Sequence, residues 1–129
     1  MLNIYDKIQR HLLGKTRGTS RKQEILDAFM DIVLRHSRKH REVKYYASRL
    51  CISVRYLSEI TRELMGERPK QIIDRNIISE IKLMLTFSNM SVQQIADYLY
   101  FPDQSYLGRF FKHHVGMSPL EYRKQEMVM

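Results

Sequence analysis

The chain has 129 residues, a hydrophobic share of 43% and a net charge of +8, which suits one domain, or two very small ones, with a real core. The positive net charge favours an acidic partner, with nucleic acid as the first candidate and an anionic membrane surface as the second. A basic protein that has no charged partner could have the same composition. The single cysteine, Cys51, excludes a disulfide framework or a cysteine-based metal cluster, and no apolar run approaches transmembrane length. A lone thiol is typical of the reducing cytoplasm, and the apolar neighbours of Cys51 predict a core position for it; a reactive thiol is the alternative.

The N-terminal segment combines a short apolar stripe with a small, basic linker. The stripe falls at residues 4, 5, 8, 12 and 13, and the linker GKTRGTSRK follows with two glycines. The start has no continuous apolar h-region and is therefore not a signal peptide. We interpret residues 1–19 as the tail of an upstream region, which makes the chain a C-terminal fragment; the alternative is a complete short protein.

Helical periodicity runs through the rest of the chain and predicts an all-α fold of seven main helices. The first is long and begins near residue 21, and the next four are expected at about 43–50, 54–65, 69–86 and 92–99. Two more follow, one containing residues 106–115 and a last one near the C-terminus. Side-chain oxygens at five positions are the expected N-caps: Ser20, Ser53, Ser91, Asp103 and Ser118.

An internal duplication organises these helices into two copies. Three positions of the first copy recur 50 residues later, and one upstream position recurs after 49: Leu57, Gly66, Pro69 and Ala47 match Leu107, Gly116, Pro119 and Ala96. Each copy has a short helix, a tight turn, a longer helix, a glycine stop and a proline restart. We therefore divide the chain into an N-terminal segment (1–19), a first helix-turn-helix subdomain (20–68), a linker helix (69–87) and a second helix-turn-helix subdomain (88–129).

The second helix of each copy is expected to bury one face and expose the other. The residues on the exposed face distinguish a DNA-reading helix from a purely structural hairpin. The inward positions are Leu57, Ile60, Thr61 and Leu64 in the first copy, and Leu107, Phe110, Phe111 and His114 in the second. The outward positions are Arg55, Ser58, Glu59 and Arg62, and then Gln104, Ser105, Gly108, Arg109 and Lys112. Such outward groups can read base edges in the major groove.

Residues 91–123, SVQQIADYLYFPDQSYLGRFFKHHVGMSPLEYR, resemble the DNA-binding domain of the AraC/XylS family of bacterial transcription regulators. The matching positions are Ile95, Ala96, Phe101, Asp103, Ser105, Tyr106, Arg109, Phe111, Lys112, Gly116 to Pro119, Tyr122 and Arg123. The first copy, ASRLCISVRYLSEITRELMG, matches more diffusely, and the similarity covers about residues 20–125. The chain departs from the family at Tyr100 (usually glycine), Leu107 (usually aromatic) and Thr61 (usually phenylalanine), which puts turn geometry in question more than DNA binding.

The resemblance implies sequence-specific binding to double-stranded DNA, with two recognition helices in successive major grooves and no enzymatic activity. A linker helix of about 17 residues is roughly 25 Å long, whereas successive major grooves are one DNA turn, about 34 Å, apart. Because the helix is shorter than this spacing, a rigid linker favours DNA that bends to bring the two grooves closer. The implied protein is bacterial, cytoplasmic and nucleoid-associated, with RNA polymerase as a further partner and without cofactor, metal or membrane. This chain is expected to be monomeric, and the full-length protein to be dimeric through a missing N-terminal domain.

Two groups of DNA contacts are expected. The base-reading candidates are Arg55 and Arg109 for guanine, Gln104 for adenine, Glu59 for a cytosine amino group, and Ser58, Ser105 and Gly108 beside them. The phosphate candidates are Lys44, Arg62, Lys112 and the cap amides at Ser53 and Ser91. An alternative role for Glu59 is a salt bridge that positions a neighbouring arginine. Because the two readers differ, the DNA site is expected to be asymmetric.

A rival interpretation is a helical protein-interaction module whose basic faces bind an acidic partner. Salt-dependent binding to duplex DNA with a strong preference among sequences distinguishes the two. RNA binding is disfavoured because no aromatic platform for stacking bases is evident. His36 and His40 have a metal-binding spacing, but their basic neighbours repel a cation and the glutamate of a zinc-protease motif is missing.

Overall fold

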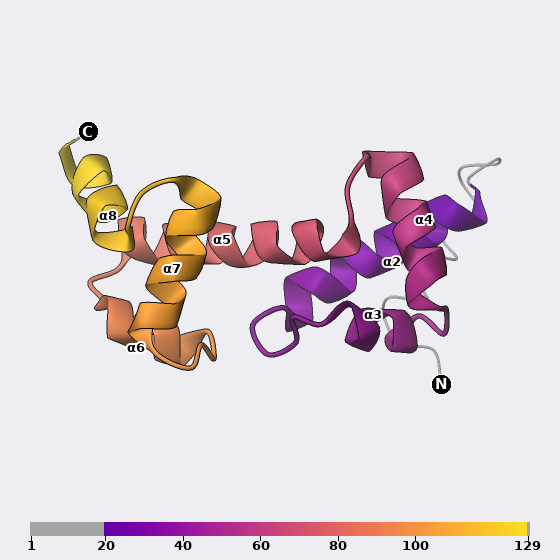
Figure 1. Ribbon diagram of the computed structural model, residues 1–129, viewed down its shortest axis with the longest axis horizontal. Coiled ribbons are helices and arrows are strands. Elements are labelled where there is room, and N and C mark those ends of the chain that lie inside the picture. Colours follow the sequence, from indigo (N-terminus) through magenta and orange to yellow (C-terminus); the bar gives the residue numbers. More distant parts are fainter. Residues whose placement is uncertain (1–19, 129) are drawn as a thin grey trace. The chain divides into compact units, whose positions relative to one another are not determined.

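The computed structural model describes residues 20–128, and these residues form seven α-helices and no strand (Figure 1). The helices are α2 (Arg21–His36), α3 (Val43–Arg49), α4 (Val54–Met65), α5 (Pro69–Phe87), α6 (Val92–Tyr98), α7 (Gln104–Val115) and α8 (Pro119–Val128). The all-α fold with two helix-turn-helix pairs is confirmed. The apolar stripe at residues 4–13 lies outside the described residues. Within them, no helix is both long and apolar enough to span a bilayer.

The ends of the helices are set by local hydrogen bonds that the sequence predicts. Each of the five expected N-cap side chains accepts a bond from the amide three residues later, at 2.7 to 3.1 Å. Ser91 also completes a reciprocal capping box, because its own amide donates to Gln94 at 2.8 Å. At the start of α2 only half of such a box forms, since the Gln23 side chain donates to Asp27 instead.

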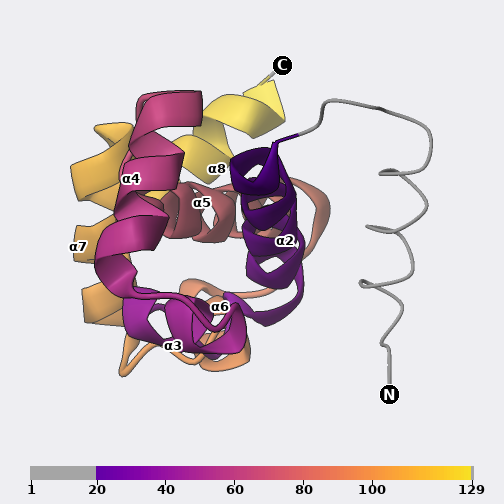
Figure 2. The ribbon, with the colours of Figure 1, turned by 90° about the vertical axis from the view of Figure 1, so that its right-hand side faces the viewer.

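Two compact units divide the chain inside α5, after Ile73. The first unit contains α2, α3 and α4 together with the beginning of α5, and Figure 2 shows α3 crossing beneath the ends of α2 and α4. Phe29 and Tyr46 are fully buried and meet edge to face, with ring centroids 5.6 Å apart. The Tyr46 hydroxyl donates to the carbonyl of His40 at 2.5 Å, and burial raises the pKa of this phenol. Leu57 and Ile60 of α4 complete the core.

The second unit contains α6, α7, α8 and the remainder of α5. Its core is built from aliphatic side chains of three helices and one phenylalanine, all essentially inaccessible: Ile77, Ile81 and Leu85 of α5, Ile95 of α6, and Leu107 and Phe111 of α7. Arg123 of α8 ties this core to the end of α5, because its guanidinium donates to the carbonyl of Leu85 at 2.9 Å. α8 therefore caps the C-terminal end of α5 by a side chain rather than by packing alone.

Both copies make the same turn between their first and second helices. The amide of Ile52 donates to Ala47 at 3.0 Å, and the amide of Phe101 donates to Ala96 at 2.8 Å. The residues just before them, Cys51 and Tyr100, have φ of 57° and 59°, the left-handed conformation that closes a helix. The turn geometry thus persists although neither of these two left-handed positions is a glycine. The prediction that Cys51 is a core residue is wrong, because this left-handed position turns its side chain out to solvent.

Two side chains that were expected to point inward, Leu64 and His114, are exposed. Leu64 is 38% exposed, and it lies in the last turn of α4, beyond the buried positions Ile60 and Thr61. His114 is exposed in the last turn of α7, where its Nδ1 bonds the carbonyl of Phe110 at 2.9 Å. The ring also packs on Phe110, with centroids 4.5 Å apart, and its Nε2 lies 3.6 Å from Asp74 Oδ2.

Candidate nucleic-acid interface

The outward face of α7 collects polar and positively charged side chains on one side of the helix. Gln104, Ser105, Arg109 and Lys112 are exposed, whereas Leu107 and Phe111 on the opposite side are fully buried. The predicted outward set of α7 is therefore brought together on one surface. Side chains that donate and accept hydrogen bonds can read base edges, and this face carries both kinds of group.

Gly108 lies within this face and has open space around it. A Cβ atom added there would have no heavy atom within 4 Å outside its own helix. Close packing against a neighbouring helix, the structural explanation for a glycine in a helix interior, therefore does not apply within the described residues. The absence of a side chain lowers the surface of α7 next to Arg109 and would let a groove wall approach the backbone.

The outward face of α4 carries an arginine and a glutamate that pair with each other. Arg55 Nε lies 3.6 Å from Glu59 Oε1, and the two side chains are 90% and 57% exposed. They are one helical turn apart, where an exposed pair contributes about 0.3–0.5 kcal/mol. The salt-bridge role of Glu59 is thus present in the free chain, and the pair stays accessible to a ligand. Ser58 beside it is half-buried.

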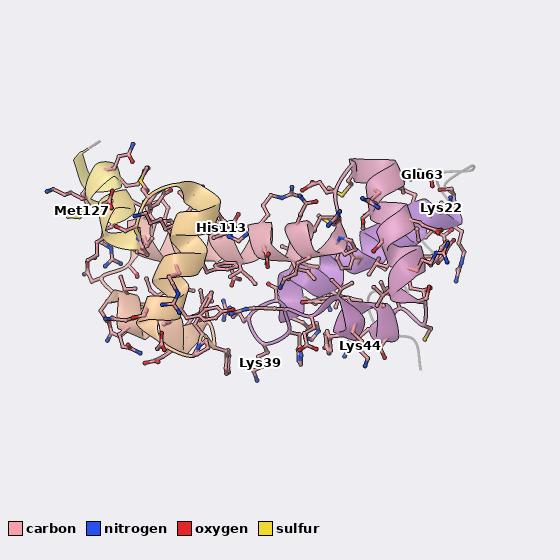
Figure 3. The ribbon with its side chains drawn as sticks, in the orientation of Figure 1. Lys22, Lys39, Lys44, Glu63, His113 and Met127 are labelled. Carbon is pink, nitrogen blue, oxygen red and sulfur yellow. The ribbon has the colours of Figure 1, made fainter. Side chains whose placement is uncertain are left out.

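The five candidates for phosphate contact are all exposed and come from four elements of the two units. They are Lys44 in the first turn of α3, Ser53 and Arg62 at the two ends of α4, Ser91 at the cap of α6 and Lys112 in the last turn of α7. Figure 3 shows Lys44 on the outside of the first unit. The Ser91 amide already donates to Gln94, so an anion at this cap would have to use the next amides of α6.

One lysine of the first unit, Lys22, forms an ion pair within the protein. Lys22 Nζ lies 2.6 Å from Glu63 Oε2, which joins α2 to α4, and the hydrogen bond to this carboxylate raises the pKa of the ammonium (Figure 3).

His40 stacks on Tyr45 with ring centroids 3.7 Å apart, and the ring centroid of His36 lies 6.0 Å from that of Tyr45. Burial, then the charge of Arg49, lowers the pKa of His36. Among residues 20–128, no cluster of three metal-binding side chains occurs.

Sequence reasoning did not assign a role to Tyr106, although the residue is part of the motif. Its ring lies under the guanidinium of Arg109, with the Cζ atom 5.9 Å from the ring centroid. The spacing of three residues on one helix could have indicated this contact, because side chains at i and i+3 are neighbours on the helix surface.

The middle and C-terminal parts of the chain match a known family. Residues 46–125, more than half of the chain, match the model of a helix-turn-helix domain family. An HTH-type transcriptional regulator of Bacillus subtilis, YisR, is 33% identical over 69 residues, which are 54% of this chain and 24% of the relative. The arabinose operon regulatory protein of Salmonella typhimurium is 31% identical over 84 residues, 65% of this chain and 30% of the relative. The chain thus matches less than a third of the length of these relatives.

Solved structures share the fold. The C-terminal domain of AraT, a response regulator from Geobacillus stearothermophilus, has a TM-score of 0.74 at 22% identity, over 82% of this chain and 88% of that one. The DNA-binding domain of AdpA, a global transcriptional factor solved in complex with a target DNA, has a TM-score of 0.71 at 25% identity, over 80% and 93%.

The fold defines a protein with two helix-turn-helix pairs, an architecture that it shares with the DNA-binding domain of AdpA. The chain belongs to the AraC-type helix-turn-helix family of transcription regulators, as the family match over residues 46–125 establishes.

Proposed function

We propose that this chain reads a specific duplex DNA sequence with α4 and α7, each in a major groove and the two in successive grooves. The base-reading residues are Arg55, Ser58, Glu59, Gln104, Ser105, Gly108 and Arg109, and the phosphate contacts are Lys44, Ser53, Arg62, Ser91 and Lys112. The observation that supports this assignment best is the exposed face of α7, where Arg109 and Lys112 flank a glycine with open space around it.

The two readers have different chemistry, which favours an asymmetric DNA site. In the repeat, Glu59 of α4 occupies the position of Arg109 in α7, and Arg55 occupies the position of Ser105. We assign guanine to Arg109 and Arg55, adenine to Gln104, and a cytosine amino group to Glu59. Since Glu59 also pairs with Arg55, the two side chains of α4 would read neighbouring bases as a unit.

The biological setting follows from the family and is part of the proposal. The chain is the DNA-binding part of a bacterial, cytoplasmic, nucleoid-associated regulator that acts on transcription together with RNA polymerase. It has no catalytic activity. By itself it is monomeric, and it becomes dimeric where a further domain precedes it. A protein-interaction module that binds an acidic partner is the alternative function.

Two substitutions on α7 separate base reading from phosphate binding. Arg109→Ala should cost about 1–3 kcal/mol on the cognate duplex and relax discrimination at one base pair. Lys112→Ala should weaken binding to every duplex and reduce the slope of log K against log salt by about 1. Fluorescence anisotropy at several salt concentrations measures both effects. Equal losses on cognate and random DNA for Arg109→Ala would contradict its base-reading role.

A further inference from the structure

We propose that Tyr106 is a positioning residue that holds the guanidinium of Arg109 in place for base reading by α7. This role rests on the proposed function, because it requires Arg109 to contact a base. It adds a specificity-determining residue that touches no base itself: the aromatic ring fixes where the reading group stands before DNA arrives.

The geometry places the two side chains in contact on the exposed face of α7. The Cζ atom of Arg109 is 5.9 Å from the centroid of the Tyr106 ring, within the range of a cation–π interaction. Among residues 20–128, no carboxylate forms an ion pair with Arg109, so the aromatic ring is the group that orients it. A guanidinium held over a ring keeps its edge donors free, and these are the donors that a guanine accepts.

Tyr106 is in turn held by the core of the second unit. Its ring centroid is 6.0 Å from that of Phe101, a turn residue that is 5% exposed, and Phe101 lies 5.5 Å from Phe110. The amide of Phe101 is fixed by its bond to Ala96 at 2.8 Å. A continuous set of ring contacts thus leads from the rigid helix-turn-helix corner to the half-exposed tyrosine and then to the arginine.

The repeat shows that the two readers hold their arginines by different means. Tyr56 occupies the position of Tyr106 in the first copy, but the residue three positions later is Glu59 rather than an arginine. In α4 the arginine stands one turn earlier, and the carboxylate of Glu59 pairs with it at 3.6 Å. Each recognition helix therefore presents one restrained arginine, with an aromatic support in α7 and an acidic support in α4.

Ordering a long, exposed side chain on binding costs conformational entropy. An arginine that is already held in place in the free protein loses less entropy when it binds DNA. Loss of the ring should therefore weaken binding to the cognate duplex and lower its preference over duplexes altered at the base pair read by Arg109. Binding to random duplex should change little, since random DNA makes no such base contact.

A double-mutant cycle tests the role. Tyr106→Leu keeps an apolar group against Phe101 and removes the aromatic face; Tyr106→Phe keeps the face and removes the hydroxyl. We expect Tyr106→Leu to weaken binding to the cognate duplex by about three- to tenfold, and by less than about twofold when Arg109→Ala is already present. Tyr106→Phe should stay within about twofold of the unaltered chain. Tyr98→Leu, which removes a similarly exposed tyrosine from α6, is the matched control.

The outcomes separate the possible failures. An equal loss from Tyr106→Leu with and without Arg109 would show that the tyrosine contacts DNA or supports the fold, and would overturn this role alone. An equal loss from Tyr106→Phe and Tyr106→Leu would assign the effect to the hydroxyl, with the same consequence. If Arg109→Ala itself left base preference unchanged, the proposed function of α7 would fail, and the positioning role with it. Circular dichroism and thermal unfolding of each variant exclude a loss of folding.

Discussion

At the scale of single residues, we expect substitutions of Gly108 to have opposite effects on stability and on DNA recognition. Glycine in a helix interior is less favourable than alanine by roughly 1 kcal/mol, and the space around Gly108 is open. We therefore expect Gly108→Ala to raise the free energy of unfolding by about 1 kcal/mol, and Gly108→Leu to leave the fold intact or slightly more helical. The leucine should nevertheless impair binding to the cognate DNA, because it stands between the backbone and the groove.

Urea unfolding and DNA binding, measured on the same variants, check this expectation. Loss of folding in Gly108→Leu would place Gly108 in the core after all. Full DNA affinity in a stably folded Gly108→Leu would show that α7 does not approach DNA at this position.

Cys51 and Tyr100 adopt a conformation that costs energy for residues with a side chain. Both have positive φ near 60°, where a Cβ atom costs roughly 1–2 kcal/mol. Replacing either residue by glycine removes this cost, but part of the gain is lost because glycine has more conformational freedom in the unfolded chain. Tyr100→Gly and Cys51→Gly should each raise the free energy of unfolding by about 0.5–1 kcal/mol. Gly66→Ala and Gly116→Ala, at φ of 71° and 91°, should shift stability in the opposite direction. Thermal melts of the four variants test the pattern, and a destabilised Tyr100→Gly would contradict it.

Residue positions were predictable where the physics is local or periodic. The five N-caps form as expected because each needs only an oxygen and an amide three residues away. The error at Cys51 arose because apolar neighbours predict burial, whereas the left-handed turn that exposes it depends on backbone geometry. The spacing of three residues makes Tyr106 and Arg109 neighbours on α7, but the placement of the guanidinium over the ring also depends on side-chain conformations, which the spacing does not fix.

At the scale of elements, the helix boundaries were predictable to within a few residues, and the contacts between helices were not. The bounds of α4, Val54–Met65, coincide with those expected from Ser53 and Gly66, since caps at both ends are visible in the sequence. The bond from Arg123 to the end of α5 joins residues 38 positions apart, and no local pattern indicates it.

Arg123 provides the test at this scale. Its guanidinium donates to the carbonyl of Leu85 at 2.9 Å and, at longer range, to those of Met84 and Ser88. Arg123→Met should lower the free energy of unfolding of the second unit by about 1–2 kcal/mol, because part-buried carbonyls lose a charged donor. Arg123→Lys should recover only part of this, since an ammonium cannot reproduce the planar set of donors. Hydrogen exchange of the α5 amides measures the effect, with exposed Lys124→Met as the charge-matched control; equal effects of Arg123→Met and Lys124→Met would contradict the capping role.

At the scale of the whole molecule, the two copies share a fold but differ in the chemistry of their exposed faces. Both turns, both second helices and both glycine stops repeat, as do the buried leucines Leu57 and Leu107. The outward residues do not repeat: an ion pair of opposite charges stands on α4, and an arginine, a lysine and a glycine stand on α7. Since we propose α4 and α7 as the two readers, their different exposed residues predict an asymmetric DNA site.

Selection of bound sequences from a random duplex DNA pool tests this central claim most directly. We expect enrichment of a non-palindromic site with two separate blocks of preferred bases. One block should contain a guanine whose preference disappears in Arg109→Ala, and the other a guanine whose preference disappears in Arg55→Ala. A pool without enrichment at moderate salt, or a site that keeps both preferences in these variants, would contradict the assignment of α4 and α7 as the two readers.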